Sequence, residues 1–165
     1  MKWIVESLAK KHDRSQFDCG VVALNQYLKQ LASQHAKRNI SKTYVAIRDG
    51  ETQVGGFYAL STGSMILEYL PETARAHLPR YPIPTAHLGQ LAIDKKAQGQ
   101  GLGEALLFDA LRRVARIGDE LGIYAITVDA IDEHAKAFYE RYGFIAIIGD
   151  PLHLYLELKV IRQLL

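Results

Sequence analysis

The part of this sequence best suited to chemistry is a glycine-rich run between a predicted strand and a predicted long helix. The run reads Gln98, Gly99, Gln100, Gly101, Leu102 and Gly103. Glycines let the backbone turn tightly and approach a ligand closely, and the amides of a first helical turn have no internal acceptor. Such a run can hold a pyrophosphate, although a plain strand-to-helix turn is the alternative interpretation. Neither the Lys-Ser/Thr pair of a nucleotide P-loop nor the G-x-G-x-x-G spacing of dinucleotide sites is present.

A second stretch, on the helix predicted after the next strand, carries a cluster of aromatic residues. Its sequence is Ala137, Phe138, Tyr139, Glu140, Arg141, Tyr142, Gly143 and Phe144. A tyrosine hydroxyl placed in a cleft can act as a general acid. An aromatic residue at helical spacing equally fits a structural place in the core, so the residues alone leave both roles open for Tyr139.

These two stretches together resemble the signature motifs of the GNAT family of N-acetyltransferases. The glycine-rich run follows Leu91, Ala92, Ile93 and Asp94, as in the first motif, and the aromatic helix resembles the second. The predicted order of elements also matches that family, so the resemblance covers nearly the whole chain. It implies the GNAT fold, with acetyl-CoA as co-substrate.

The resemblance narrows to the GNAT toxins of bacterial type II toxin–antitoxin systems. It rests on residues 17–20, which read FDCG, on residues 23–28, which read ALNQYL, and on residues 88–94, which read LGQLAID. In that group the enzyme acetylates the α-amine of aminoacyl-tRNA and blocks translation. The resemblance implies a ribbon-helix-helix antitoxin, operator DNA bound through it, a homodimer and a cytoplasmic location.

The resemblance also implies roles for individual residues. Backbone groups of Leu91, Ala92 and Ile93 are expected to align the pantetheine arm and support the oxyanion. The amides of residues 98–103 are expected to hold the pyrophosphate. Tyr139 is expected to be the general acid that protonates the departing coenzyme A thiolate.

No general base is evident in the sequence. Several titratable residues are available without a signature of their own: Asp94, Glu104, Asp129, Asp132 and His134. A free α-amine has a pKa of about 8, so an appreciable fraction is neutral at pH 7. The ε-amine of lysine has a pKa of about 10.4 and therefore depends more strongly on a base. The missing base therefore favours an α-amine acceptor. Cys19 lies far from both motifs in the sequence, so we expect direct attack without an acetyl-enzyme.

The net charge is only +2, but it is unevenly distributed along the sequence. Residues 10–48 carry eight Lys and Arg against two Asp, while the remainder is acidic. Basic side chains neutralise phosphates, although a solvated surface is the alternative interpretation of each one. The predicted tRNA-binding residues are Lys29, Lys37, Arg38, Lys42, Arg75 and Arg80.

Length and composition indicate what kind of protein carries these sites. The 165 residues predict a single domain, residues 1–165, and 48% hydrophobic against 23% charged residues is typical of a globular protein. One cysteine excludes an intrachain disulfide, and His87 and His134 lack metal-ligand spacing, so no metal site is expected. No apolar run is long enough to span a membrane, and Glu6 interrupts any signal peptide.

Hydrophobic periodicity predicts an α/β fold, a twisted mixed sheet with helices on both faces. A turn at Asp49 and Gly50 predicts a hairpin, and four prolines interrupt the segment 63–84. Strands are expected near 1–8, 43–47, 54–62, 88–93, 123–128, 144–148 and 152–158, the last with one buried face. Helices are expected near 24–39, with Leu31 on the apolar face, near 101–122, and near 132–143, with Asp132 as the N-cap.

Two other functions remain open from the sequence. One is a GNAT acetyltransferase that acts on a protein N-terminus, a lysine or a small amine. The other is a non-catalytic acetyl-CoA-binding partner in an antitoxin repressor complex.

Overall fold

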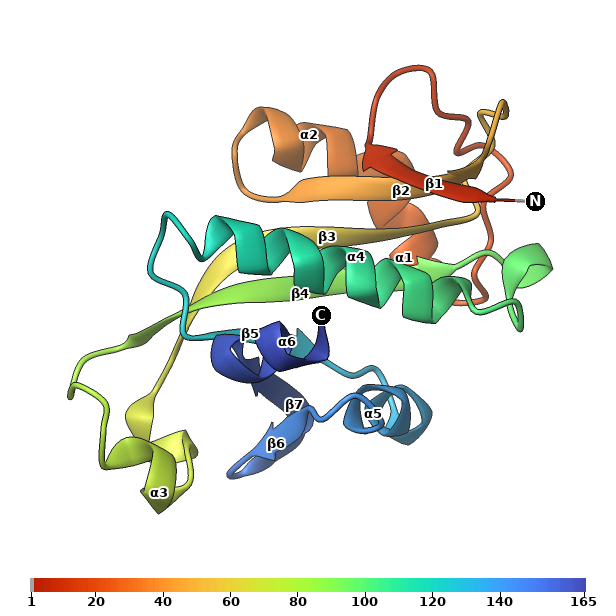
Figure 1. Ribbon diagram of the computed structural model, residues 1–165. Coiled ribbons are helices and arrows are strands. Elements are labelled where there is room, and N and C mark those ends of the chain that lie inside the picture. The colour runs from red at the N-terminus through yellow and green to blue at the C-terminus, as the bar shows by residue number, and fades with distance from the viewer. Residues whose placement is uncertain (1) are drawn as a thin grey trace. The chain divides into compact units, whose positions relative to one another are not determined.

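The computed structural model describes residues 2–165 (Figure 1). The strands form one mixed sheet in the order β1-β2-β3-β4-β5-β7-β6. They are β1 Trp3–Ser7, β2 Lys42–Arg48, β3 Gly56–Met65, β4 Ile83–Ile93, β5 Ala125–Asp129, β6 Ile145–Ile147 and β7 Asp150–Glu157. The helices are α1 Val22–Gln26, α2 Ala32–Lys37, α3 Glu72–Arg75, α4 Leu102–Ile117, α5 Glu133–Glu140 and α6 Leu158–Leu164. The predicted mixed α/β architecture is confirmed.

The chain packs as two compact units. The first unit contains Met1–Ser61 and Gly89–Ala110, and the second contains Thr62–Leu88 and Leu111–Leu165. The glycine-rich run lies in the first unit and Tyr139 in the second. Each unit is described by itself below.

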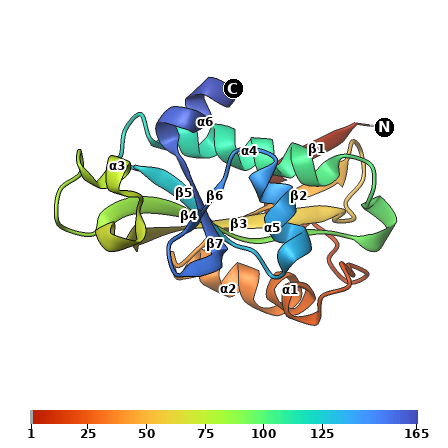
Figure 2. The same ribbon diagram turned by 90° about the horizontal axis from the view of Figure 1, so that it is seen from below.

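The first unit is built on the predicted hairpin. β2 pairs antiparallel with β1 on one side and with β3 on the other. Gly50 in the turn has φ +80°, which a residue without a side chain adopts at no steric cost. Figure 2 shows α1 and α2 on one face of these strands and the beginning of α4 on the other. On the α1–α2 side, Phe17, Leu28 and Phe57 are fully buried and pack in one cluster.

The helix predicted near 24–39 is interrupted by a π-helical turn. α1 passes into a π-helix at Tyr27–Leu31 and then into α2, and the Ala32 amide donates to the Tyr27 carbonyl. This i→i+5 bond inserts one residue into the turn and shifts the buried face. Ala32 is therefore fully buried, while Leu31, which the sequence placed on the apolar face, is 41% exposed.

The second unit contains the parallel pair that the βα connection requires. β4 pairs with β5 from Thr85 opposite Ala125 to Leu88 opposite Val128, and β4 then runs on to Ile93. β7 pairs antiparallel with both β5 and β6. β5 ends at Asp129, one residue after its last pair with β4.

Several predicted boundaries are wrong. β4 begins at Ile83 rather than Leu88, and α4 ends at Ile117, with Leu121 beyond it 57% exposed. The sequence placed Leu158 in the last strand, but it begins α6, which was not predicted. Tyr155 is buried, so β7 buries both of its faces instead of one. Alternation alone does not show what covers the second face of a strand.

Candidate active site

The glycine-rich run forms a loop that ends at the N-terminus of α4. Gly99 has φ +78° and Gly101 has φ +80°. A Cβ on either residue would meet nothing within 4 Å, so backbone conformation rather than space calls for glycine. The Ala105 amide donates to the Gly101 carbonyl at 3.1 Å, and the side chain of Leu102 is buried. The amides of the first turn of α4 precede the helical ladder and, with the helix dipole, suit an anion such as pyrophosphate.

Two glutamine side chains stabilise the loop through hydrogen bonds to backbone carbonyls. The Gln98 Nε2 donates to the Ile93 carbonyl at 2.9 Å, and the Gln100 Nε2 donates to the Lys96 carbonyl at 3.2 Å. These amide side chains are engaged with the protein backbone. The backbone N–H groups of Gln98 and Gln100, rather than these side-chain amides, are therefore the donors that an anion could use.

The end of β4 is fixed to the same loop within the first unit. Ala92 is buried, whereas Leu91 and Ile93 are half-buried. Gln90 adopts φ +62° in the middle of the strand, a conformation that costs a non-glycine residue about 1–2 kcal/mol. Such an outlier interrupts the regular alternation of the strand just before Leu91.

Arg48 is a basic residue beside this loop that the sequence analysis did not select. Its guanidinium lies 4.7 Å from the Trp3 ring centroid, and it donates to Gln100 Oε1 at 3.4 Å. Arg48 and Lys96 line a cavity of about 230 Å³. In the sequence, the position of Arg48 within the basic segment 10–48 was the signal that could have identified it.

Tyr139 lies on α5, whose N-cap is Asp132 as predicted. The Asp132 carboxylate accepts from the Ala135 amide at 2.8 Å. Tyr139 is 7% exposed and contacts the ring of Phe144, with ring centroids 5.4 Å apart. Burial raises the pKa of its hydroxyl, so the group stays protonated throughout the neutral range. A neutral, buried hydroxyl can donate a proton or a hydrogen bond.

A histidine–aspartate–histidine cluster on three neighbouring strands was missed by the sequence analysis. His87 on β4, Asp129 on β5 and His153 on β7 belong to one unit. His87 Nε2 lies 3.5 Å from Asp129 Oδ2, and His153 Nδ1 is hydrogen-bonded to Asp129 Oδ1. The two imidazole rings are near parallel, with centroids 6.4 Å apart. Only the strand register brings these residues together, so no local motif could have revealed them.

Cys19 lies closer to the loop than its position in the sequence indicates. Its carbonyl accepts from Gln98 Nε2 at 3.3 Å, so the two residues meet in space although they lie far apart in the sequence. Burial raises the pKa of its thiol, however, which disfavours the nucleophilic thiolate. The raised pKa therefore disfavours a role of the half-buried thiol as an acetyl carrier.

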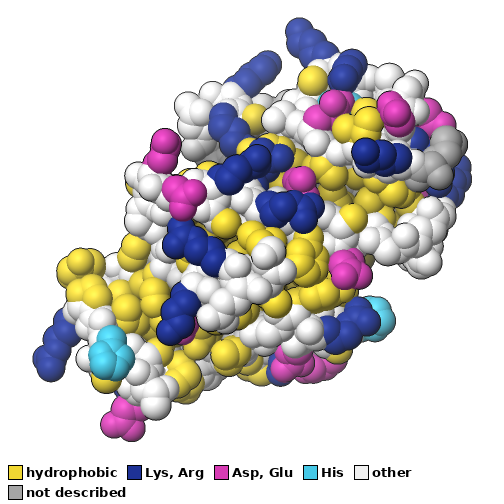
Figure 3. Space-filling view, viewed as in Figure 1, with side chains coloured by type: hydrophobic (Ala, Val, Ile, Leu, Met, Phe, Trp, Pro, Cys, Tyr) yellow, Lys and Arg dark blue, Asp and Glu magenta, His cyan; other side chains and the backbone are white. Residues whose placement is uncertain are grey.

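The predicted tRNA-binding residues divide between the two units. Lys29, Lys37, Arg38 and Lys42 are exposed in the first, where the Lys42 ammonium donates to the Ala36 carbonyl at 2.9 Å. Figure 3 shows that Lys and Arg also lie among hydrophobic and acidic side chains over the face that carries α4. Basic side chains are thus not confined to the predicted tRNA-binding residues.

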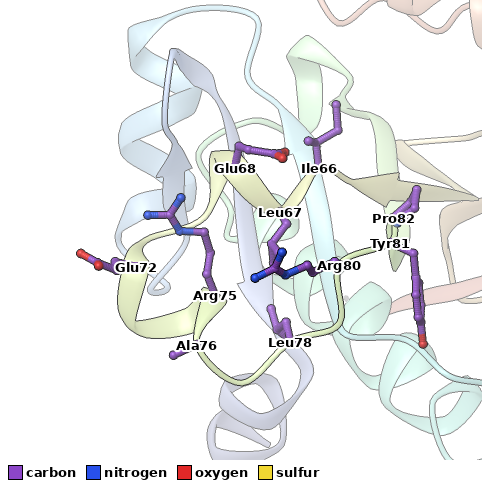
Figure 4. A pocket seen from close by; sticks show the side chains of 10 residues that line it. All are labelled: Ile66, Leu67, Glu68, Glu72, Arg75, Ala76, Leu78, Arg80, Tyr81 and Pro82. Carbon is purple, nitrogen blue, oxygen red and sulfur yellow. The ribbon is translucent and has the colours of Figure 1, made fainter.

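In the second unit, Arg75 and Arg80 line a pocket of about 810 Å³. Figure 4 shows the Arg80 side chain extending between Leu67 and Leu78 toward Arg75, while Glu72 points outward. Neither arginine has an ion-pair partner within residues 2–165. Glu68 and Glu72 also line this pocket, so an anionic ligand would bind to the two guanidinium groups only on the side away from these carboxylates.

The described residues hold no group of three or more His, Cys, Asp or Glu arranged for a metal ion. Across positions 2–165, each helix is too short or too polar to cross a membrane.

Comparison with known proteins connects this geometry to a family. Residues 16–153 match the model of the acetyltransferase (GNAT) domain. A tRNA-acetylating toxin of Mycobacterium tuberculosis is 39% identical over 153 residues, which cover 93% of this chain and 90% of that protein. A crystal structure of a KacT mutant superposes with a TM-score of 0.95 at 35% identity and covers 100% of both chains.

Structures of AtaT show what that protein binds. AtaT complexed with acetyl-methionyl-tRNAfMet matches with a TM-score of 0.92 at 32% identity over 99% of both chains. Other matching structures contain AtaT with its antitoxin AtaR together with acetyl-CoA or with DNA. The family match spans most of the chain, and relatives above 30% identity cover nearly all of it. This chain therefore belongs to the GNAT family and is an acetyltransferase.

Proposed function

We propose that this acetyltransferase is the toxin of a type II toxin–antitoxin system and acetylates the α-amine of aminoacyl-tRNA, so that translation stops. The observation that carries the proposal is the glycine loop, with positive φ at Gly99 and Gly101, at the start of α4. The acetylating toxin of M. tuberculosis and the tRNA complex of AtaT support the choice of acceptor. Residues 1–165 would form a single acetyltransferase domain.

The loop and β4 would bind acetyl-CoA, which supplies the activated acetyl thioester. Backbone amides of residues 98–103 would hold its pyrophosphate, because the glycine conformations and the helix start suit an anion. Backbone groups of Leu91, Ala92 and Ile93 would align the pantetheine arm where β4 continues beyond its last pair with β5. The same amides would support the oxyanion that forms during attack.

Tyr139 would protonate the thiolate of coenzyme A as it leaves. In the reaction the amine nitrogen forms a bond to the acetyl carbon, the carbon–sulfur bond breaks, and the sulfur receives a proton. The raised pKa of Tyr139 keeps its hydroxyl neutral and able to donate. Its buried position excludes competing water from that proton.

The phosphates of the tRNA would be neutralised by basic side chains from both units. The exposed residues of the first unit are Lys29, Lys37, Arg38 and Lys42, and the pocket of the second adds Arg75 and Arg80. An antitoxin of ribbon-helix-helix type would neutralise the enzyme and bind operator DNA. The structures of AtaT with its antitoxin AtaR, and of the AtaT–AtaR complex with DNA, support an antitoxin partner and a DNA complex. The toxin would work as a homodimer in the cytoplasm, where charged tRNA is found.

A transfer assay with labelled acetyl-CoA tests the proposal. Bulk charged tRNA should acquire the label, uncharged tRNA should not, and Tyr139→Phe should strongly reduce the transfer. Label on peptide N-termini, lysines or small amines, with none on charged tRNA, would refute the tRNA substrate. Acetyl-CoA binding without any transfer would instead indicate a non-catalytic partner.

A further inference from the structure

We propose that Asp18 is a positioning residue for acetyl-CoA, and that together with Asn25 it holds the turn before the glycine-rich run in its binding conformation. This inference rests on the proposed function, because Asp18 would act through the backbone amides that bind the pyrophosphate. Residues 17–20 contribute to the resemblance with the GNAT toxins, but the reaction described above does not use their side chains. All the groups that carry the inference belong to the first unit.

The glycine-rich run needs support from neighbouring segments. Glycine loses more conformational freedom on ordering than any other residue, and the run has positive φ at Gly99 and Gly101. Backbone amides bind an anion well only when they already point toward one place, because ordering them on binding costs free energy. Residues that fix the run therefore contribute to affinity without contacting the ligand.

The backbone of Asp18 is hydrogen-bonded to the turn from which the run begins. Its amide donates to Asp94 Oδ2 at 3.0 Å, and its carbonyl accepts from the Lys95 amide at 2.9 Å. The other carboxylate oxygen of Asp94 accepts from the Lys96 amide at 2.8 Å, so it caps the short helix Lys95–Ala97. Asp94 is buried, and both of its oxygens accept from backbone donors. This buried carboxylate thus connects residue 18 to the turn.

The next residue along the chain contacts the run itself. The Cys19 carbonyl accepts from Gln98 Nε2 at 3.3 Å, and the same nitrogen donates to the Ile93 carbonyl at 2.9 Å. Gln98 is the first residue of the run, so its side chain connects Cys19 to the end of β4. A Cβ on Gly20 would lie 3.2 Å from Lys95 Cε, which shows how closely the two segments approach.

The Asp18 side chain fixes the conformation of its own segment. Its Oδ1 accepts from the Gly20 amide at 2.9 Å and from Asn25 Nδ2 at 3.0 Å. Asn25, on α1, completes the link because its Oδ1 accepts from the Cys19 amide at 2.9 Å. The hydrogen bonds from Asn25 and then from Gly20 lower the pKa of Asp18, so the group is a carboxylate at neutral pH.

The same segment is anchored in the hydrophobic core on its other side. Phe17 is buried, and its ring packs edge-on against Phe57 with the centroids 5.5 Å apart. The core therefore fixes one end of the segment and Asn25 fixes the other. Between them, Asp18 and Cys19 present their backbone groups to the turn. Removal of the Asp18 side chain should loosen the turn while the core stays packed.

Calorimetry of acetyl-CoA binding, which needs no tRNA, tests the proposal. Asp18→Ala should raise the Kd for acetyl-CoA about 10-fold, because hydrogen bonds to a charged group are lost and the run must order on binding. Asn25→Ala removes both bonds of the amide and should raise the Kd by a similar factor. Asp18→Asn keeps an oxygen for both donors, so its Kd should stay within about three-fold of wild type.

Asp13→Ala is the matched control. Asp13 precedes Asp18 in the same loop, and its Oδ1 accepts from the Ser15 amide at 3.0 Å, the same two-residue pattern that joins Asp18 to Gly20. Its side chain bonds to Ser15 rather than to α1. The control variant should keep the wild-type Kd for acetyl-CoA.

Steady-state kinetics separate positioning from a folding defect. In Asp18→Ala the KM for acetyl-CoA should rise about 10-fold while kcat stays within about two-fold, whereas a partly unfolded enzyme would lose kcat at unchanged KM. An unchanged Kd in both Asp18→Ala and Asn25→Ala, or an equal rise in Asp13→Ala, would overturn the inference.

The glycine variant Gly101→Ala separates this inference from the proposed site. If Asp18→Ala binds acetyl-CoA normally while Gly101→Ala binds it weakly, the positioning role alone fails. If both variants bind it normally, the proposed pyrophosphate site fails as well. Because the calorimetric result does not depend on the acceptor, a failure to acetylate charged tRNA would refute the proposed substrate without deciding the role of Asp18.

Discussion

The two units perform chemistry with different parts of the polypeptide. In the first, the proposed acetyl-CoA site consists of backbone groups, and its side chains Gln98 and Gln100 only hold the loop in place. In the second, the proposed proton transfer depends on the side chain of Tyr139. Changes in the glycine loop should therefore alter acetyl-CoA binding, and changes at Tyr139 should alter the rate.

The largest effect should come from the buried tyrosine. Tyr139→Phe removes the proton donor but keeps the ring against Phe144, so turnover should fall by about 10²–10⁴-fold. The Kd for acetyl-CoA, measured by calorimetry, should stay within two-fold. If the variant instead loses much of its affinity for acetyl-CoA, Tyr139 in the second unit also contributes to acetyl-CoA binding.

A smaller effect should come from the glycine loop. Gly101→Ala places a side chain at φ +80°, which costs about 1–2 kcal/mol and should weaken acetyl-CoA binding by about 10-fold if the loop adapts by moving. Gly50→Ala is the matched control, because Gly50 has the same φ of +80° but lies in the hairpin turn rather than in the glycine-rich run. Equal loss of thermal stability in both variants, with weaker binding only in Gly101→Ala, would support the assignment.

The arginine pocket should affect tRNA alone. Replacing Arg75 and Arg80 together with Gln should raise the KM for charged tRNA about 10-fold and reduce its salt dependence, because fewer counterions are released. The KM for acetyl-CoA should not change. Wild-type salt dependence in this double variant would assign tRNA binding to other basic residues.

The smallest effect should come from the cysteine. Cys19→Ser keeps the shape of the residue and removes the thiol, whose pKa is raised by burial. Activity should stay within about two-fold of wild type, as expected if direct attack needs no acetyl-enzyme. Trapping of an acetylated Cys19 by mass spectrometry would contradict direct attack.

The glycine loop and the aromatic helix were predictable because their information is local. Asp132 as the N-cap of α5 and the turn at Gly50 follow from residue type and position, and the structure confirms both. The π-helical turn was not predictable, since Leu31 and Ala32 exchange burial through one inserted residue. The α6 helix was also missed, because Leu158 continues the alternation of the preceding strand.

By itself the sequence determined the family, the order of most elements and the loop at the start of α4, because each depends on residues that are close together in the sequence. Tertiary structure alone decided which residues meet across strands. His87, Asp129 and His153 lie up to 66 positions apart, and hydrogen-bonded register places them on one face. Register depends on packing of whole strands, and a shift of one residue would turn every side chain to the opposite face.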